Sequence, residues 1–530
     1  MESFLSLSPF EVKNILYALA EECCRKEKSC GKEHLLLDVG RGNPNFLNTT
    51  VRDGFDLLSL FSTSVTTGEM HGLAFYPHKE KIQEKWHSFL QERKHEKCAD
   101  FLKQAISFAC KRFSFNKEDL LFALCEAALG ATYPTPPRIL PFVEKIVKAY
   151  LDKVLCLSEK AISDRYLLFA TEGATAAMIY VFFSLKMNML LREGDAIAII
   201  TPIFSPYLEI PLLQEYQFRE IFIQTTEKNE WQIPQSEIEK LKDPKIKALF
   251  FVDPTNPTAT SLEGASFDRL VELVRNQRKD LIILTDTVYA PFVPHFRSLV
   301  DEIPENMVCI YSFSKYFGVT GWRLGVVMLH EKNVLDRLIE AHAPAVKQKL
   351  FERYHTLTLD PNRFPFIERM VADSREEALA HTSGLSTPQQ CFMALLSLFD
   401  LMDENDSYKK AVKSLLKRRM EKLYSSLQLT LPNEERNTYY YAMIDLVSIA
   451  RTRYGDPFAQ YLASKQVMSF FFALAEKKAT ICLPGFGFGG SLWSLRISLA
   501  NCNEEDYSEV GKNILQILEN FYHEWTELFS

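Results

Sequence analysis

Between residues 160 and 330, short and continuously apolar segments alternate with stretches of helical pattern. The seven apolar segments are 166–170, 196–200, 219–223, 247–252, 281–285, 307–311 and 324–329. Apolar runs of this length are typical of strands buried on both faces, as in a parallel sheet covered by helices. The pattern therefore predicts an α/β fold with a mostly parallel seven-stranded sheet. Such a sheet binds its ligand at the carboxyl ends of the strands.

The length of the chain predicts more than one domain. It has 530 residues, and beyond roughly 250–300 residues a single core usually splits. We expect residues 136–385 to form a large domain around the sheet. Residues 386–530 would supply a linking segment of one long helix or two, followed by a smaller α+β domain that residues 1–54 complete. Residues 55–135 have a helical pattern throughout and predict a helical insertion.

Composition excludes several classes of protein. The net charge is −7 and no long Lys/Arg run occurs, so we expect no nucleic-acid partner. The 11 cysteines are scattered without CxxC spacing, and the N-terminus lacks a signal-peptide pattern, which predicts a reducing, cytoplasmic location. No apolar run is long enough to predict a membrane span. The 11 histidines form no HxxxH pair, so no metal site is expected.

The strongest chemical signal follows the apolar segment 307–311. Ser312, Ser314 and Lys315 come directly after it, and Arg323 lies eight residues beyond the lysine in a glycine-rich loop. A lysine amine forms a Schiff base with a carbonyl compound, while hydroxyls and a guanidinium group bind a phosphate. The group therefore suits an aldehyde cofactor that carries a phosphate. The pattern S-F-S-K-x-x-G-x-x-G-x-R-x-G resembles the lysine motif of the fold-type I aminotransferases, which use pyridoxal 5'-phosphate.

This resemblance assigns roles to residues at other strand ends. It implies that Lys315 holds the cofactor and is the catalytic base. Asp286 lies 29 residues before Lys315 and would keep the pyridine nitrogen protonated, which makes the ring a better electron sink. Tyr289 and Asn256 would both bind the phenolic oxygen of the cofactor, and Asn256 would also face the substrate.

The phosphate and the ring of the cofactor have further expected partners. Gly173, Ala174 and Thr175 follow the segment 166–170 and open a helical stretch. Backbone amides at the N-terminus of a helix form an anion site, so this turn suits the phosphate, together with the two serines and the arginine named above. Phe204 matches the aromatic residue that stacks on the cofactor ring in the family.

An arginine near the C-terminus predicts a substrate contact. Arg496 lies within the apolar segment 492–498, where an unpaired charge is costly. The α-carboxylate of an amino acid would supply a bidentate partner. The fold-type I aminotransferases place their carboxylate-binding arginine in such a strand.

Four further parts of the chain resemble a narrower family, the aspartate 4-decarboxylases, which also act as aspartate aminotransferases. They are Gly40–Asn45, Gly130–Pro134, Ala170–Met178, and Asp373–Arg375 with His381–Gln390. The resemblance covers nearly the whole chain. It implies β-decarboxylation of L-aspartate to L-alanine and CO2. It also implies a side transamination of aspartate and 2-oxoglutarate to oxaloacetate and glutamate.

The narrower resemblance also suggests how the side-chain carboxylate of aspartate is bound. A second carboxylate needs a second cation, and Arg375 is offered for this role, in its own subunit or in a neighbouring one. Arg41, Gly130 and Tyr133 would also contact the substrate. The homodimeric active sites of the family imply a homo-oligomer, either a dimer or a larger assembly of dimers.

Two alternatives stay open at this point. A plain class I/II aminotransferase, or an enzyme similar to 1-aminocyclopropane-carboxylate synthase, would use the same fold and cofactor. A regulator that binds pyridoxal phosphate or an amino acid without catalysis is the alternative from another class. A non-catalytic regulator would not need all of these residues. The chain has a lysine, an aspartate, a tyrosine, an asparagine and two arginines at positions that match catalytic or binding residues of the family.

Overall fold

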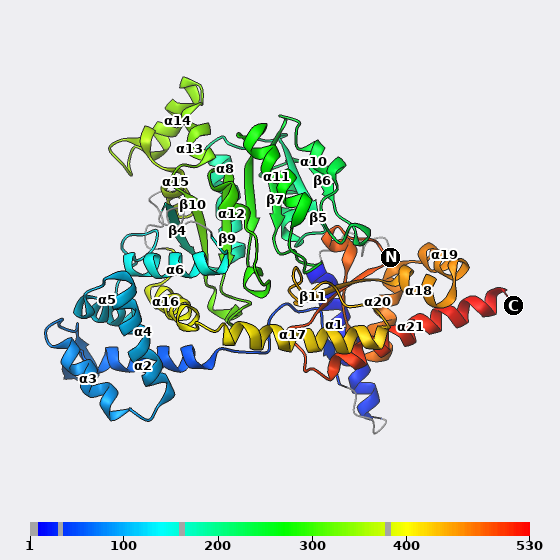
Figure 1. The fold of residues 1–530 in the computed structure, drawn as a ribbon, viewed down its shortest axis with the longest axis horizontal. Coiled ribbons are helices and arrows are strands. Elements are labelled where there is room, and N and C mark those ends of the chain that lie inside the picture. The colour runs from blue at the N-terminus through cyan, green and yellow to red at the C-terminus, as the bar shows by residue number, and fades with distance from the viewer. Residues whose placement is uncertain (1–8, 30–34, 158–164, 377–382, 530) are drawn as a thin grey trace.

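The computed structural model describes residues 9–29, 35–157, 165–376 and 383–529. Its centre is a seven-stranded sheet with the strand order β4-β10-β9-β8-β7-β5-β6 (Figure 1). The strands are β4 (Tyr166–Thr171), β5 (Ala196–Thr201), β6 (Arg219–Gln224), β7 (Ile246–Val252), β8 (Ile282–Asp286), β9 (Met307–Ser312) and β10 (Gly325–His330). All seven lie within one residue of the predicted segments, and the expected fold is confirmed.

One strand runs against the other six, and this helps to build the site. β10 is antiparallel to both of its neighbours, β4 and β9, whereas the pairs from β5 to β9 are parallel. β10 therefore begins at the edge of the sheet where the other strands end. The loop before β10, which contains Arg323, reaches the same edge as the residues that follow β4, β8 and β9.

Helices pack on the sheet and bury the apolar strands. The helices around the sheet are α6 (Pro141–Val154), α8 (Ala174–Met187), α9 (Pro206–Glu209), α10 (Gln235–Lys240), α11 (Gly264–Asn276), α12 (Leu299–Glu302), α13 (Val334–Glu340), α14 (Pro344–Tyr354) and α15 (Phe366–Asp373). α8 contacts β4, β9 and β10, and α15 packs on α8. Every residue of β5, β8, β9 and β10 is buried, as expected for strands covered on both faces.

The two ends of the chain come together beside the large sheet. β1 (Leu37–Asp38) pairs in parallel with β12 (Thr480–Ile481), and α1 (Pro9–Ser29) packs on α20 (Val467–Lys478). A second sheet has the order β11-β14-β13, formed by β11 (Tyr441–Asp445), β14 (Ser494–Ser498) and β13 (Leu483–Pro484). The remaining helices here are α18 (Leu446–Tyr454), α19 (Asp456–Ser464) and α21 (Asp506–Phe529).

The stretch between the chain's N-terminal part and the large sheet is mainly helical. It contains α2 (Thr49–Ser64), α3 (Ile82–Glu92), α4 (Lys97–Phe113) and α5 (Lys117–Leu129). It also contains a hairpin, β2 (Thr67–Met70) and β3 (Leu73–Phe75), which the helical prediction missed. Figure 1 shows this unit to one side of the sheet, where α2, α4 and α5 pack on α16 (Thr387–Met402). The exact domain boundaries stay a prediction.

The linking segment consists of two helices. α16 ends at Met402, and α17 (Ser407–Leu427) begins after Asp406, whose φ of 51° interrupts the helical path. α17 runs on to pack against α21. Among the described residues, no helix combines the length and the apolar character needed to cross a membrane.

Candidate active site

A cavity of about 400 Å3 lies between the strand ends of the large sheet and the adjoining N-terminal and C-terminal parts of the chain. Twelve of the predicted site residues line it: Arg41, Ala174, Thr175, Phe204, Asn256, Asp286, Tyr289, Ser312, Ser314, Lys315, Arg323 and Arg496. The sequence prediction missed other lining residues: Lys13, Gly40, Gly42, Asn43, Val252, Val288, Thr320 and Tyr441. The cavity therefore collects side chains from segments more than 450 residues apart in the chain.

Lys315 lies just past β9, with its amine inside the cavity. Its Nζ donates a hydrogen bond to the carbonyl oxygen of Gly42 at 3.0 Å. Burial lowers the pKa of Lys315, and the positive charges of Arg496 and Arg323 act in the same direction. A lowered pKa increases the fraction of neutral amine, which is the form that acts as a nucleophile or a base.

Asp286 is the last residue of β8 and is buried in the wall of the cavity. Burial raises its pKa to about 6, although the backbone N–H of Val288 donates to Oδ1 at 3.1 Å and acts to lower the pKa. A buried carboxyl group with few donors is a strong acceptor for a protonated ring nitrogen. The position suits the role that the resemblance assigned to Asp286.

A group of three tyrosines lies beside these two residues. The hydroxyls of Tyr289 and Tyr441 are 2.9 Å apart, and Tyr440 donates to the carbonyl oxygen of Gly42 at 2.9 Å. Burial raises the pKa of Tyr289 and of Tyr440 well above the ordinary value, so both phenols are neutral near pH 7 and can donate hydrogen bonds. Tyr441 thereby ties the strand β11 of the second sheet to the predicted cofactor contact Tyr289.

The opposite end of the cavity has the features of an anion site. Gly173 precedes α8 and has a φ of 88°, a conformation that favours glycine. An added Cβ at Gly173 would come within 2.7 Å of Arg323 Nη2. The same guanidinium donates to the carbonyl oxygen of Glu172 at 3.1 Å, and Ser312 donates to Ser314 at 3.0 Å. An arginine, two hydroxyls and the first amides of a helix thus meet at one point, as phosphate binding requires.

Arg496 lies in β14 and is only 2% exposed. Its guanidinium stacks on the rings of Tyr441 and Phe488, at 4.7 and 4.8 Å from the ring centroids. One Nη donates to the carbonyl oxygen of Gly40, but Nε has no hydrogen-bond partner and the group has no ion pair among the residues that the structure describes. A buried guanidinium that faces a cavity without a carboxylate partner is suited to bind a carboxylate ligand.

Comparison with known proteins identifies the family. Residues 131–514 match the model of aminotransferase class I and II. The chain belongs to the class I and II aminotransferases. A relative from Pseudomonas sp, described as a bifunctional aspartate aminotransferase and L-aspartate beta-decarboxylase, is 40% identical over 536 residues, which cover 99% of this chain and 98% of the relative.

Solved structures of aminotransferases share the fold. A double mutant of the Thermus thermophilus aspartate aminotransferase superposes with a TM-score of 0.60 at 15% identity, covering 95% of this chain and 96% of that chain. An aromatic aminotransferase from Pyrococcus horikoshii OT3 gives 0.58 at 18% identity, covering 92% and 96%. The family depends on pyridoxal 5'-phosphate, so the expected cofactor and the expectation of an enzyme are both confirmed.

The residues of the cavity fit this cofactor. The amide of the buried Asn256 has its Oδ1 without a hydrogen-bond partner among the described residues, as does Nε of Arg496 in the same wall, so both side chains have capacity left for a ligand. The turn at Gly173 leaves no room for a Cβ next to Arg323, which keeps the backbone close to the presumed phosphate position. Lys315 and Asp286 line the same cavity, as the amine and the ring-nitrogen partner of this cofactor must.

Arg41 and Lys13 add positive charge on the side of the cavity formed by the N-terminal part of the chain. Arg41 forms an ion pair with Asp38 at 2.8 Å, and its side chain is 48% exposed. Lys13 lies on α1, which the sequence predicted as a helix without indicating which of its residues would face the site. Arg41 was therefore predicted from the resemblance, whereas no local signal distinguished Lys13.

Three predicted substrate residues do not line the cavity of their own chain. Gly130 ends α5 with a φ of 63°, and an added Cβ there would meet Pro388 at 2.8 Å. Tyr133 is 69% exposed. Arg375 is buried and donates from Nη2 to the carbonyl oxygen of Pro137 at 2.7 Å. Gly173 also lies outside the lining itself, but it contacts Arg323 as described above.

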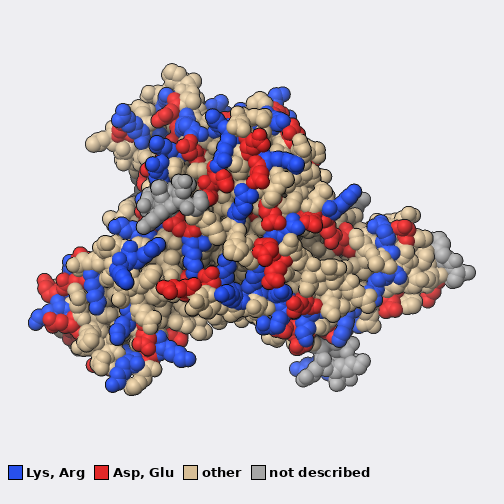
Figure 2. Space-filling view, in the orientation of Figure 1, with Lys and Arg blue, Asp and Glu red and all other residues tan. Residues whose placement is uncertain are grey.

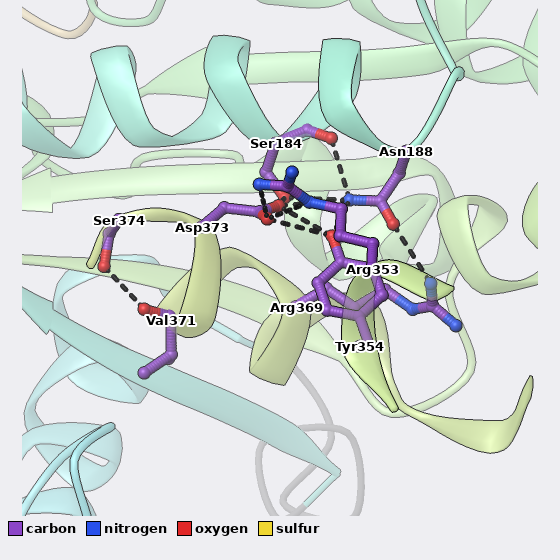
Figure 3. A network of polar contacts seen from close by, with 8 residues as sticks. All are labelled: Ser184, Asn188, Arg353, Tyr354, Arg369, Val371, Asp373 and Ser374. Carbon is purple, nitrogen blue, oxygen red and sulfur yellow. Dashed lines mark hydrogen bonds and ion pairs between the residues drawn. The ribbon is translucent and has the colours of Figure 1, made fainter. Parts of the chain in front are cut away.

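A buried polar network fixes the segment before Arg375 (Figure 3). Asp373, at the end of α15, accepts hydrogen bonds from Ser184 of α8 at 2.6 Å and from Asn188, which caps the C-terminus of α8, at 3.2 Å. Arg353 of α14 forms an ion pair with it at 2.9 Å, and Tyr354 donates to it as well. These contacts hold α15 on α8, so Arg375 is held away from the cavity by a rigid support. The motif residues 381 and 382 lie outside the described residues.

Proposed function

We propose that this chain catalyses the pyridoxal-phosphate-dependent β-decarboxylation of L-aspartate to L-alanine and CO2. Transamination of aspartate and 2-oxoglutarate to oxaloacetate and glutamate would be its side activity. The observation that carries this proposal is the presence of two arginines, Arg496 and Arg41, in the same cavity as Lys315. A substrate with two carboxylates needs two cationic partners. The relative from Pseudomonas sp, whose description names both activities, supports the same choice.

Different residues of the cavity would hold the ring, the phenolic oxygen and the phosphate of the cofactor. Pyridoxal phosphate, when bound, supplies an electron-withdrawing ring that stabilises negative charge next to the amino group of the substrate. Asp286 accepts a hydrogen bond from the ring nitrogen and keeps it protonated. Tyr289 and Asn256 hold the phenolic oxygen. Arg323 and the two serines hold the phosphate, which fixes the ring relative to Lys315.

Lys315 is the residue that would transfer protons to and from the substrate. With substrate in the cavity, the neutral amine of Lys315 would accept the proton from Cα. Its lowered pKa matches this role, since a base must be neutral to accept a proton. In the decarboxylation the bond between Cβ and the side-chain carboxylate breaks, CO2 leaves, and a proton takes its place. Arg496 binds the α-carboxylate throughout, and Arg41 orients the carboxylate that leaves.

Access of water decides between the two reactions. Entry of water into the cavity would favour release of oxaloacetate, and 2-oxoglutarate would then take up the amino group to complete the transamination. Arg41 is half-exposed at the side of the cavity formed by the N-terminal part, and Lys13 of α1 lies in the same wall. We infer that this wall, by excluding water, sets the ratio of the two products.

The test is a product analysis. Purified protein is incubated with pyridoxal phosphate, aspartate and 2-oxoglutarate as amino-group acceptor, and alanine, CO2 and oxaloacetate are measured together. Equal amounts of alanine and CO2 in excess of oxaloacetate support the proposal. Oxaloacetate without CO2 would indicate a plain aminotransferase. Binding of both compounds without turnover would indicate the regulator that the sequence left open.

Several features of the enzyme remain proposals alongside its reaction. We infer a homo-oligomer of at least two subunits, in which Gly130, Tyr133 and Arg375 of one subunit would approach the cavity of another. We also infer a cytoplasmic location, from the scattered cysteines and the N-terminal sequence. The substrates are small molecules, as the aminotransferase relatives indicate.

A further inference from the structure

A second cavity, of about 480 Å3, is lined by residues that follow β8 and β9 and by residues of α17. Its walls come from the end of α6, the segment 291–295 after β8, and the first half of α17. Five lysines line it: Lys153, Lys409, Lys410, Lys413 and Lys417. We call it the lysine cavity. Figure 2 shows Lys and Arg side chains gathered over α17, in the middle of the face that is drawn.

The acidic residues of the lysine cavity are already engaged by two of the five lysines. Lys153 forms ion pairs with Asp400 at 3.1 Å and with Asp406 at 2.9 Å. Lys417 forms an ion pair with Glu434 at 2.7 Å. These three carboxylates are the only ones among the described residues that line the cavity. Five lysines and three carboxylates give the lining an excess of two positive charges, and Lys409, Lys410 and Lys413 have no ion pair with these carboxylates.

Lys413 is the most buried of these three, at 9% exposure. Its Nζ donates to the backbone carbonyl of Glu434 at 3.0 Å, which uses one of its three N–H groups. Burial lowers its pKa to about 8, yet the group remains mainly protonated near pH 7. Neither Lys409, which is half-buried, nor the exposed Lys410 has an ion pair within the described part of the chain.

Three ammonium groups around one cavity repel one another, and a buried ammonium is costly without an anionic partner. A bound anion would offset this repulsion and the cost of burying Lys413. The volume of the cavity lies within the range of small-molecule sites, about 300–1,000 Å3. An anion with two or more acidic groups could contact Lys409, Lys410 and Lys413 at once.

The lysine cavity is distinct from the active site but adjoins the same strand end. The two cavities share no lining residue. Tyr316 forms part of the wall, and its hydroxyl donates to Asp400 at 2.9 Å. Tyr316 directly follows Lys315, and Tyr408 of α17 donates to its carbonyl oxygen at 3.1 Å. A ligand in the lysine cavity would therefore touch the residue next to the catalytic lysine.

We propose that the lysine cavity binds a small multivalent anion, either a polycarboxylate or a compound with a pyrophosphate group. Lys409, Lys410 and Lys413 supply the charge, and Lys153 and Lys417 hold the acidic residues away from the ligand. This second site is independent of the proposed reaction, since none of its residues lines the active-site cavity.

The test uses the enzyme with pyridoxal phosphate bound, so that the cofactor occupies its own phosphate site. Pyrophosphate and citrate are titrated separately by calorimetry at constant ionic strength. Saturable binding of either anion is expected, and the tighter of the two identifies the acidic group that the site prefers. The double variant Lys409→Gln/Lys410→Gln should weaken this binding at least about tenfold, since each lost charge contact is worth roughly 1 kcal/mol.

A matched control removes the same charge from the same helix. Arg418 and Lys422 lie on α17 but form ion pairs with Glu504 and Glu505, outside the lysine cavity. The variant Arg418→Gln/Lys422→Gln should leave the affinity unchanged. If both double variants bound the anion equally weakly, the loss would reflect the net charge of the protein, and the proposal would be overturned. The absence of saturable binding for both anions would overturn it as well.

A chemical footprint gives a second readout. Cys156 is exposed and lies in the wall of the lysine cavity. The bound anion should slow the alkylation of Cys156, measured by mass spectrometry of its peptide. The half-buried Cys98, which does not line the cavity, is the internal reference. Alkylation of Cys156 that is unaffected at a saturating anion concentration would place the anion elsewhere and contradict the proposal.

Discussion

The strand-end cavity and the region around Arg375 differ in how the chain supplies their residues. In the cavity, side chains from five strand ends and from both chain termini meet within one volume. Gly130, Tyr133 and Arg375 matched the same family but lie outside this volume, on a helix end, an exposed turn and a buried support. The comparison teaches that sheet topology alone assembles the cofactor site. In the homo-oligomer that we propose, residues outside the sheet edge would depend on how the subunits are arranged.

The largest expected effect comes from the residue at the centre of the cavity. Lys315→Ala removes the base, and general base catalysis is worth roughly 100- to 10,000-fold. We expect activity with aspartate to fall by at least this factor, and borohydride to trap no cofactor on the protein. The exposed Lys247→Ala on β7 serves as the control and should keep full activity. Trapping of the cofactor at another lysine in the Lys315 variant would contradict the assignment.

The second effect tests the carboxylate site in the same cavity. Arg496→Gln removes one partner of a buried charge pair, which costs about 2–5 kcal/mol, or roughly 30- to 4,000-fold in kcat/KM. The absorbance spectrum of the bound cofactor should change little, because the proposed contact is with the substrate. A fall in kcat/KM for aspartate of less than tenfold would remove Arg496 from the substrate site.

These two predictions rest on positions that the sequence could reveal. Continuous apolar strands end where polar residues begin, so the strand ends, and with them Asp286, Ser312 and Lys315, were placed within one residue. Lys13 and Tyr441 were missed because each comes from a segment far from the sheet in sequence. Only the three-dimensional fold brings these segments to the cavity. The hairpin β2–β3 was missed since its strands are only four and three residues long and lie between stretches of helical pattern.

The third effect is one of stability and changes with pH. The pKa of Asp286 is about 6 in the folded protein and roughly 3.9 in an unfolded chain. Because the folded pKa is raised, this group favours folding most below pH 4, and the contribution is lost as the pH rises through 6. In the cofactor-free protein, Asp286→Asn should therefore raise the free energy of unfolding by about 2–3 kcal/mol at pH 8, with no difference near pH 4.

The measurement is urea denaturation of the cofactor-free protein at both pH values, together with activity at pH 8. Activity of the loaded variant should fall although its stability rises, since the amide cannot hold the ring nitrogen protonated. If the variant were less stable than the natural protein at pH 8, burial of the ionised Asp286 carboxylate would not be destabilising. That result would argue against the proposed role of Asp286.

A smaller effect is expected from the tyrosine pair that joins the two sheets. Tyr441→Phe removes the hydrogen bond to the hydroxyl of Tyr289, and a bond of this kind contributes about 1 kcal/mol, or roughly fivefold. We expect a fivefold loss in kcat and a shift in the absorbance of the bound cofactor. The buried pair Tyr150 and Tyr311, with hydroxyls 2.6 Å apart outside the cavity, supplies the control Tyr311→Phe, which should leave the absorbance unchanged.

The smallest effect returns to the region around Arg375. In its own chain the guanidinium is bound to Pro137, and Asp373 fixes the helix before it, so Arg375→Gln should mainly lower the thermal midpoint of unfolding. Because we propose that Arg375 approaches the cavity of a neighbouring subunit, we also expect a rise of about twofold to fivefold in the KM for aspartate, smaller than for Arg496→Gln. An unchanged KM would leave Arg375 as a support of its own chain. Mixing the Arg375→Gln and Lys315→Ala subunits decides between the two, because hybrid oligomers regain an intact site only when Arg375 acts across the interface.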